Sequence, residues 1–225
     1  MTLVISATEV ATTVATTATT IYLIMPYEYR TLTPEQREEV LARRKAMGFP
    51  LHAPPHPFRE AGYYLITAAN YEHARVMESP ARRSEFEKRL LQALREIEAE
   101  IVGWVVLANH YHFLAGVESL DDVSAALKQL HGSTSHEWNK ADGLQGRRRV
   151  WYKFADRMIR DNAHYFRALN YIHYNPVKHG YVENAADWSW SSLSLYYEDH
   201  GRDWLREKWK SHLPEKDFGA GWDDL

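Results

Sequence analysis

The sequence predicts an α+β domain: a four-stranded antiparallel sheet in ferredoxin-like order, with helices on one face. Segments rich in aromatic and β-branched residues are typical of strands, and they alternate with longer segments whose apolar residues recur every three or four positions. From residue 63 onward the order is strand, helix, strand, strand, helix, strand, with one more helix after them. A βαββαβ order is the one in which such a sheet is built.

The four strands are expected at four separate hydrophobic runs. "YYLITAA" at 63–69 is the first, and "IVGWVVLA" at 101–108 is the second. "YHFLAGVE" at 111–118 is the third, and we expect it to form a hairpin with the second across Ala108–Asn109. "VWYKFADRMI" at 150–159 follows a loop rich in Gly and Arg, and it is the fourth.

Two amphipathic helices connect these strands. The first spans 79–100, and its buried face is expected to carry Phe86, Leu90, Leu94 and Ile97. The second spans 121–140, and Asp121 or Asp122 is expected to cap its N-terminus. Its inward-facing residues are expected to be Val123, Ala126, Leu127 and Leu130.

The chain divides into four regions by composition. Residues 1–24, nearly all Thr, Ala and Val in their middle part, are expected to be a disordered leader. Residues 25–61 are an N-terminal extension, with a helix expected at 33–47 before a proline-rich loop. The main domain is expected at 62–182, and 183–225 is expected to be a helical appendage.

Composition limits the chemistry that the chain can perform. The chain has 225 residues, is 45% hydrophobic and holds 8 Trp and 14 Tyr, so a sizeable core is possible. It contains no cysteine, which excludes disulfides, thiolate zinc sites and cysteine nucleophiles. No segment has the length and apolar character of a membrane helix or a convincing signal peptide. We therefore expect a cytoplasmic protein.

The near-neutral total charge conceals a basic middle and an acidic tail. The formal charge of the whole chain is −3. From Arg147 to Val182 there are eight basic residues against two acidic ones, while 183–225 holds ten acidic residues against five basic ones. A basic stretch of this kind fits either ordinary solvated surface or a binding site for a polyanion.

Two histidines stand two positions apart within the third strand. A strand points residues i and i+2 to the same face, so His110 and His112 are expected side by side, with Tyr111 on the opposite face. Two neutral imidazoles so placed can share one divalent metal. The alternative is a pair of sheet histidines with ordinary hydrogen-bond partners.

The third helix supplies a possible nucleophile and a third ligand. It is expected at 161–175 and is expected to end at Pro176. Tyr171 and Asn175 lie four residues apart, which places them on one helix face. Taken without the histidines, this pair is better explained as a core tyrosine and a helix-ending asparagine, because Asn is common at helix ends.

These motifs together resemble a known family. "NHYHFL" resembles the histidine–bulky residue–histidine motif of HUH endonucleases. "YIHYNPVKHGYV" resembles the tyrosine-bearing segment of single-tyrosine bacterial transposases, above all the REP-associated tyrosine transposases. "LKQLHGSTSHEWN", "RVWYKFADRMIRD" and "DWSWSSLSLY" are similar to further segments of that group, in the same order. The resemblance covers about residues 62–200.

The resemblance implies a role for each matching residue. His110 and His112 match the metal-binding pair, Asn175 matches the third ligand, and Tyr171 matches the nucleophile. The implied cofactor is Mg²⁺ or Mn²⁺, and residues 62–182 would be the catalytic domain. The implied reaction is cleavage and rejoining of single-stranded or hairpin DNA through a 5′-phosphotyrosine link. Bound to DNA, such a protein would be associated with the nucleoid.

We expect the contacts with DNA mainly in the basic middle of the chain. Cationic side chains there would contact phosphates, and hydroxyl side chains would contact the sugar-phosphate backbone. Trp151 would stack on unpaired bases, although a place in the core is at least as well supported for a strand aromatic. The candidates are Arg147, Arg148, Arg149, Trp151, Lys153, Arg157, Lys178, Ser133 and Thr134.

Two other functions are compatible with the same motifs. One is a catalytically silent ferredoxin-like module that binds a DNA or RNA hairpin. The other is a metal-dependent hydrolase that uses water in place of Tyr171. The resemblance leaves the assembly open between a monomer and a homodimer, in which Tyr171 could serve the metal of a partner.

Overall fold

The computed structural model describes residues 61–144 and 148–214, together with four isolated residues near the N-terminus. The chain forms two compact units, Met1–Pro54 and Pro55–Leu225, and the fold below belongs to the second. The predicted leader, the proline-rich loop and the end of the tail therefore lie outside the described residues. Of the helix predicted at 33–47, only Glu35, Glu38 and Ala42 are described as helical.

The sheet has the predicted order of elements. It contains β1 (Gly62–Ala69), β2 (Glu100–Val106), β3 (His110–Val117) and β4 (Ala155–Met158). The strands lie in the order β2-β3-β1-β4, and each pairs antiparallel with its neighbours. Helix α3 (Pro80–Glu96) joins β1 to β2, and α4 (Leu120–Ala141) joins β3 to β4. The predicted α+β class and the βαββαβ order are confirmed.

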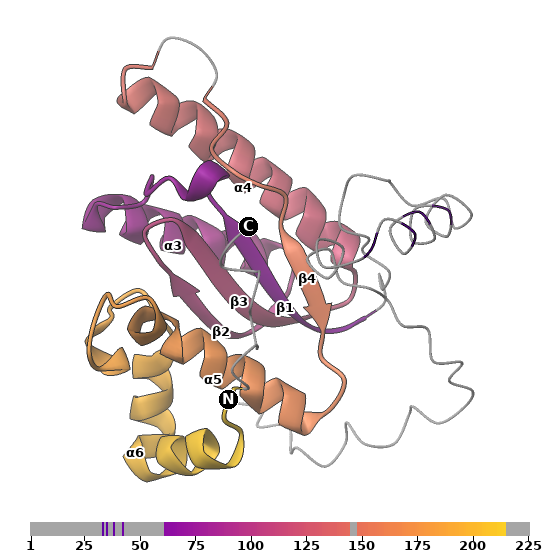
Figure 1. Ribbon diagram of the computed structural model, residues 1–225, viewed down its shortest axis with the longest axis vertical. Coiled ribbons are helices and arrows are strands. Elements are labelled where there is room, and N and C mark those ends of the chain that lie inside the picture. Colours follow the sequence, from indigo (N-terminus) through magenta and orange to yellow (C-terminus); the bar gives the residue numbers. More distant parts are fainter. Residues whose placement is uncertain are drawn as a thin grey trace. The chain divides into compact units, whose positions relative to one another are not determined.

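Helices cover both faces of the sheet. Figure 1 shows α3 and α4 on one side, and α5 (Asn162–Lys178) with α6 (Leu193–Ser211) on the other. Helix α6 is bent at Gly201, whose φ of 79° is readily adopted only by glycine. It packs against α5, where Asn170 Nδ2 donates to two carbonyl oxygens near the end of α6, at 3.0 and 2.9 Å. Helix α5, which carries Tyr171, therefore lies in a different layer from α3 and α4.

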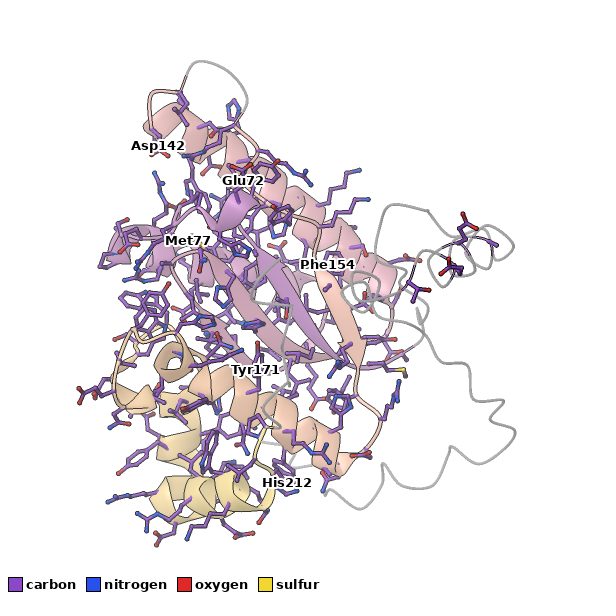
Figure 2. All side chains as sticks on the ribbon, viewed as in Figure 1. Glu72, Met77, Asp142, Phe154, Tyr171 and His212 are labelled. Carbon is purple, nitrogen blue, oxygen red and sulfur yellow. The ribbon has the colours of Figure 1, made fainter. Side chains whose placement is uncertain are left out.

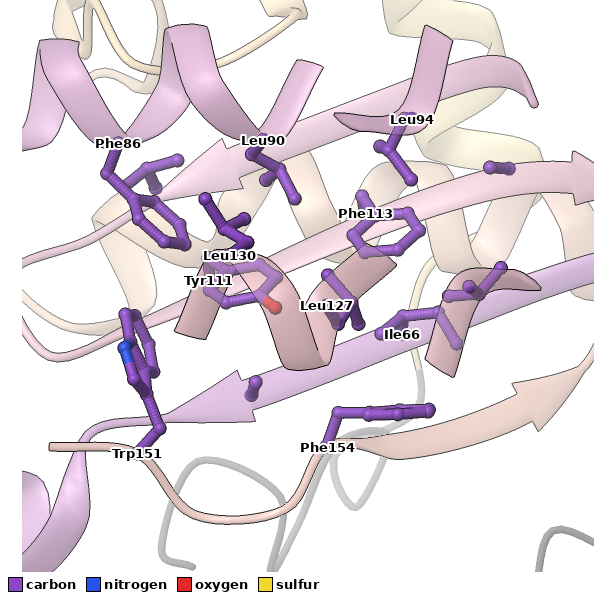
Figure 3. Packing of buried hydrophobic residues seen from close by; sticks show 14 of the residues in the cluster. Ile66, Phe86, Leu90, Leu94, Tyr111, Phe113, Leu127, Leu130, Trp151 and Phe154 are labelled. Atoms are coloured by element: carbon purple, nitrogen blue, oxygen red, sulfur yellow. The ribbon is translucent and has the colours of Figure 1, made fainter. Parts of the chain in front are cut away.

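The main core lies between the sheet and the α3–α4 layer. Figure 3 shows side chains from β1 and β3 meeting leucines and a phenylalanine from the two helices. The residues at its centre are Ile66, Phe86, Leu90, Leu94, Tyr111, Phe113, Leu127 and Leu130. Each large apolar side chain buried in this way contributes about 1.5–3 kcal/mol to folding. The helix faces predicted from the spacing of apolar residues are the faces that are buried.

The strand predicted at 150–159 is shorter than expected. Only Ala155–Met158 pairs as a regular strand, because the segment before it bends toward the core. Trp151 forms a single bridge with Asn70, and Tyr71 N donates to Val150 O at 2.8 Å. Burial of Val150, Trp151 and Phe154 outweighs the regular strand pairing that their β propensity predicts.

The N-terminal cap of α4 and the C-terminal end of α5 differ from those predicted from the sequence. Ser119, and neither of the two aspartates, caps α4: its Oγ accepts a hydrogen bond from Asp121 N at 3.1 Å. Helix α5 does not stop before Pro176 but continues to Lys178. It ends at Gly180, whose φ of 68° allows Tyr181 N to donate back to Pro176 O at 2.9 Å. Pro176 lacks the N–H that would donate to Ile172 O, but the turn after it is closed by His179 N, which donates to Asn175 O at 3.1 Å.

Within residues 61–144 and 148–214, no helix is long and apolar enough to cross a lipid bilayer.

The buried imidazole of His131 makes stability depend on pH. Its Nε2 lies 2.9 Å from the Tyr111 hydroxyl, and its ring stacks on Trp151 with centroids 4.4 Å apart. Burial lowers the pKa of His131 to about 3. Because its pKa is near 6.5 in the unfolded chain, protons bind the unfolded state more tightly. The contribution of His131 is therefore fully present above about pH 6.5 and is lost as the pH falls toward 3.

We expect the His131→Gln variant to lose part of this pH dependence. In the wild type, lowering the pH from 7.5 to 5 should cost up to about 2 kcal/mol of unfolding free energy through this residue. Urea unfolding at both pH values measures it. The exposed His136 on the same helix provides the control, since His136→Gln should keep the wild-type slope. An identical slope in His131→Gln and wild type would contradict the assignment.

Candidate active site

The two histidines of β3 project together from the sheet face that α5 covers. The rings of His110 and His112 lie with centroids 5.1 Å apart, at an interplanar angle of 78°. Both are buried, with exposed fractions of 1% and 0%. Tyr111 points to the other face, where its ring meets Phe86 at 5.0 Å. The alternation of the strand therefore separates the imidazoles from the apolar core.

Neighbouring side chains fix both rings. Thr67, directly opposite His112 in the β1–β3 register, places its Oγ1 2.7 Å from His112 Nδ1. His110 Nδ1 lies 2.8 Å from Asn109 Oδ1. In the tautomer with its proton on Nδ1, His110 donates to this amide oxygen and offers a lone pair at Nε2. Nε2 is also the ring nitrogen of His112 that Thr67 does not contact.

Helix α5 brings Asn175 and Tyr171 to this pair. Asn175 Oδ1 lies 3.1 Å from His110 Nε2, and Asn175 is fully buried. The Tyr171 ring meets the ring of His112 edge to face, with centroids 5.1 Å apart. In Figure 2, Tyr171 lies on the side of α5 that faces the sheet. All four side chains belong to β3 and α5.

The donor set fits a small divalent cation. Two lone pairs 3.1 Å apart, on His110 Nε2 and Asn175 Oδ1, repel unless a proton or a cation lies between them. Adjacent ligands in an octahedral shell of radius 2.0–2.1 Å are about 3 Å apart. Asn175 Nδ2 is buried without a hydrogen-bond partner. No group of three His, Asp or Glu residues suited to a metal occurs in the described parts, so the amide oxygen would complete the set.

Close packing of α5 on β2 sets this geometry. A Cβ atom on Gly103 would lie 2.6 Å from Leu169 Cδ1 and 3.2 Å from Ser192 Oγ. Glycine at this position leaves room for Leu169 of the helix beside the strand, and a larger residue would force the Leu169 side chain to shift. The position of α5 in turn determines where Tyr171 and Asn175 meet the histidines.

Comparison with known proteins identifies the family. No protein-family model matches the chain. The REP-associated tyrosine transposase of Escherichia coli K12 is 31% identical over 134 residues, which is 59% of this chain and 74% of that protein. A protein of Haemophilus influenzae, provisionally given the same name, is 31% identical over 52% of this chain and 76% of its own length. The chain belongs to the REP-associated tyrosine transposase family.

The fold of the family agrees with the fold described above. A solved REP-associated tyrosine transposase, bound to a REP hairpin, superposes with a TM-score of 0.54 at 23% identity. The match covers 67% of this chain and 88% of that one. The family predicted from the sequence motifs is confirmed.

In this chain the Trp-Ser-Trp-Ser-Ser segment, residues 188–192, fastens α5 to the sheet. Val106 N donates to Trp190 O at 2.9 Å, and Ser192 N donates to Trp104 O at 3.0 Å, so the segment covers the exposed edge of β2. Ser192 Oγ also lies 2.8 Å from His173 Nε2 on α5. One serine thereby joins the edge strand to the helix that carries Tyr171.

A buried arginine holds the same segment from the other side. The Arg83 guanidinium lies 5.0 Å from the ring centroid of Trp188 and 4.1 Å from that of Trp190. Arg83 is 7% exposed, and burial lowers its pKa. It also donates to Met77 O and Glu78 O, at 3.2 and 2.7 Å. Sequence reasoning missed this contact, because nothing in the local pattern of α3 distinguishes Arg83 from its exposed basic neighbours.

A lysine and a histidine at the end of α5 lie at the outer edge of the site. Lys178 Nζ is 5.1 Å from the Tyr171 ring centroid, and the His179 ring is 4.8 Å from that of His110. Both residues are exposed. Lys178 therefore places a positive charge beside the Tyr171 ring.

The other residues predicted to contact DNA differ in their burial. Arg147 lies outside the described residues. Trp151 and Thr134 are buried, and the indole N–H of Trp151 donates to Thr134 Oγ1 at 3.1 Å. The core alternative given for Trp151 therefore applies, and Thr134 is buried beside it. Ser133 accepts a hydrogen bond from Arg89 at 2.7 Å, while Lys153 is exposed. Arg148, Arg149 and Arg157 are partly or fully exposed.

Removing the Ser192 hydroxyl should loosen α5. We expect Ser192→Ala to lower the free energy of unfolding by about 1–2 kcal/mol, since it leaves His173 Nε2 buried without this oxygen. Amide hydrogen exchange in α5 should accelerate at the same time. The exposed Ser194 is the control, and Ser194→Ala should change neither quantity. Equal exchange rates in the two variants would show that Ser192 does not hold the helix.

Proposed function

We propose that this transposase cleaves and rejoins single-stranded DNA beside a hairpin, with Tyr171 as the nucleophile. One observation carries the proposal: Tyr171 packs against His112, and Asn175 from the same helix lies 3.1 Å from His110. A tyrosine at a pair of oriented imidazoles and an amide oxygen is suited to attack on a phosphodiester. Membership of the family, and the hairpin bound to the solved relative, support the choice of substrate.

The reaction exchanges one phosphate ester for another. The phenol oxygen of Tyr171 forms a bond to phosphorus, and the bond from phosphorus to the 3′ oxygen breaks. The phenol releases its proton, and the departing 3′ oxygen takes one up, so no water is consumed. The 5′-phosphotyrosine retains the energy of the phosphodiester, and another 3′-hydroxyl can reverse the step without ATP.

We propose that Nε2 of His110, Nε2 of His112 and Oδ1 of Asn175 would hold Mg²⁺ or Mn²⁺. When bound, the cation would polarise the phosphate as a Lewis acid. Thr67 and Asn109 act by keeping the two rings in the tautomer and orientation that this requires. Lys178, 5.1 Å from the Tyr171 ring centroid, adds positive charge beside the phenol as it loses its proton.

Burial of the site favours transfer over hydrolysis. Tyr171 is 2% exposed, and the two histidines and Asn175 are at most 1% exposed. Water excluded from such a site does not compete with a DNA hydroxyl for the phosphotyrosine. The groups that cover Tyr171 must move aside when the phosphodiester enters.

A covalent adduct with DNA tests the proposal. Full-length protein is incubated with Mn²⁺ and a hairpin oligonucleotide labelled on the 5′-phosphate side of the cleavage site, then denatured. We expect labelled protein with wild type and at least a thousandfold less with Tyr171→Phe, because phenylalanine has no oxygen to bond to phosphorus. Tyr174 on the same helix is 40% exposed, and Tyr174→Phe is the control that should retain the adduct.

Two other outcomes would replace the proposal. DNA cleavage that persists in Tyr171→Phe would indicate a hydrolase that uses water. Hairpin binding by wild-type protein without cleavage or adduct would indicate a silent binding module.

The support that Thr67 gives to His112 can be tested through metal binding alone. We expect Thr67→Val to weaken Mn²⁺ binding about tenfold, since loss of such a supporting hydrogen bond typically costs that much. Thr67→Ser retains the hydroxyl and should restore most of the affinity. Electron paramagnetic resonance titration of Mn²⁺ measures both variants without DNA. If Thr67→Val binds Mn²⁺ as tightly as the wild type, His112 is not held for metal binding in this way.

A further inference from the structure

A turn with a strained backbone lies just beyond the end of β1, at residues Tyr71–His73. Figure 2 shows Glu72 in this turn. Glu72 has a φ of 54° and His73 a φ of 53°, so two successive residues are left-handed. Residues other than glycine adopt this conformation rarely, and usually singly, because the Cβ atom crowds the backbone. We call residues 71–73 the left-handed turn.

Contacts from both sides hold the left-handed turn in place. His73 N donates to Asn70 O at 3.1 Å. Tyr71 N donates to Val150 O at 2.8 Å, and the Tyr71 ring meets that of Tyr152 with centroids 5.0 Å apart. A strained backbone persists only where its surroundings impose it, and such positions are typical of functional sites.

The apolar core does not explain this strain. None of the three residues of the turn is buried, and the Glu72 side chain is exposed. In the described part of the chain, the other non-glycine residue with a positive φ is Glu98, between α3 and β2. The left-handed turn therefore needs a reason other than burial of its own side chains.

The left-handed turn contacts the residue that precedes His110. Asn70 N donates to Asn109 O at 2.7 Å, which fixes the main chain of Asn109. The side-chain Nδ2 of Asn109 donates to His73 O at 3.4 Å. The other end of the same amide, Oδ1, lies 2.8 Å from His110 Nδ1. One amide side chain thus bridges the turn and a histidine of the candidate site.

The His73 carbonyl decides which end of this amide faces His110. A carbonyl oxygen only accepts hydrogen bonds, and only the NH₂ end of an amide side chain donates. Asn109 therefore turns Nδ2 to His73 and Oδ1 to His110. An oxygen at Nδ1 favours the tautomer of His110 with its proton on Nδ1, which leaves the lone pair on Nε2. That lone pair lies on the atom 3.1 Å from Asn175 Oδ1.

The opposite orientation of the amide would close the site. With its NH₂ end toward His110, Asn109 would donate to Nδ1, and the proton of the ring would move to Nε2. A protonated Nε2 has no lone pair to offer to a cation. The direction in which one backbone carbonyl points therefore bears on the ligand set.

We propose that the left-handed turn positions His110 by presenting the His73 carbonyl to Asn109. Glu72 and His73 are positioning residues, and they act on the ring of His110 through the amide of Asn109. The use of Nε2 for a cation rests on the proposed function, while the link from the turn to the ring stands on the hydrogen bonds alone.

Two substitutions at Glu72 separate the backbone conformation from the loss of the side chain. Glu72→Gly and Glu72→Val both remove the exposed carboxylate, but glycine adopts a positive φ readily and a β-branched residue opposes it. Nuclear magnetic resonance of metal-free protein with isotope-labelled histidine distinguishes the two tautomers by the ring-nitrogen shifts. The signals of His110 are those that disappear in His110→Gln.

We expect Glu72→Gly to give the His110 ring shifts of the wild type. In Glu72→Val, about half of the His110 rings should carry the proton on Nε2, because an amide that is free to turn offers either end. Identical shifts in Glu72→Gly and Glu72→Val would overturn the proposal.

Metal affinity gives a second measurement. Electron paramagnetic resonance titration should show Mn²⁺ bound about tenfold more weakly by Glu72→Val than by Glu72→Gly, the usual effect of losing a group that supports a ligand. The control is Glu98→Val, at a left-handed residue before β2, whose first residue pairs with Gly116 at the far end of β3. It should lower stability without weakening Mn²⁺ binding. Equal losses of affinity in Glu72→Val and Glu98→Val would indicate general destabilisation and overturn the proposal.

Substitutions of Asn109 test the amide step. A carboxylate accepts at both oxygens, so Asn109→Asp does not depend on His73 for its orientation. Adding Asn109→Asp to Glu72→Val should restore the proton to Nδ1 of His110, and a persisting mixture of tautomers would contradict the proposal. Should Glu72→Val fail to fold, Asn109→Leu removes the same link with the turn intact, and unchanged His110 shifts would then overturn it.

The ring shifts are measured without metal or DNA. If wild-type protein binds no Mn²⁺, the proposed metal site fails, while the shifts still decide whether the left-handed turn positions His110.

Discussion

The close approach of α5 to β2 is the contact on which the site depends. Gly103 has no side chain to keep Leu169 away, and Ser192 joins the strand edge to His173 on the helix. This packing brings Asn175 within 3.1 Å of His110. The Arg83–Trp188–Trp190 stack holds the far end of the tail segment. A set of packing and hydrogen-bonded contacts outside the site therefore determines whether Tyr171 and Asn175 meet the two histidines.

Successive side chains of β3 point to opposite faces of the sheet, so the residues of the core are separated from those of the candidate site. Tyr111 and Phe113 pack into the apolar core beneath α3 and α4, while His110 and His112 point toward α5. The backbone of β3 therefore positions the two imidazoles and also anchors the core.

Much of this arrangement follows from local patterns in the sequence. The period of two predicts that His110 and His112 share a face, and the apolar spacing predicts the buried faces of α3 and α4. Contacts distant in sequence did not follow: no local rule places α5 over the histidines, pairs Ser192 with His173, or buries Arg83 between two tryptophans. Pro176 was misjudged because hydrogen bonds from His179 N and Tyr181 N complete the end of α5 beyond the proline. Trp151 entered the core because a bent segment buries more apolar surface than a straight strand. Family resemblance supplied the roles of Tyr171 and Asn175, which spacing alone left open.

The central claim is that a tyrosine, two imidazoles and one amide oxygen converge on a single cation. Anomalous diffraction from crystals of the full chain grown with Mn²⁺ and a DNA hairpin tests it most directly. The account predicts one manganese peak within bonding distance of His110 Nε2, His112 Nε2 and Asn175 Oδ1, with the Tyr171 oxygen directed at a phosphate on that ion. Manganese bound elsewhere, with these side chains turned away from one another, would contradict it.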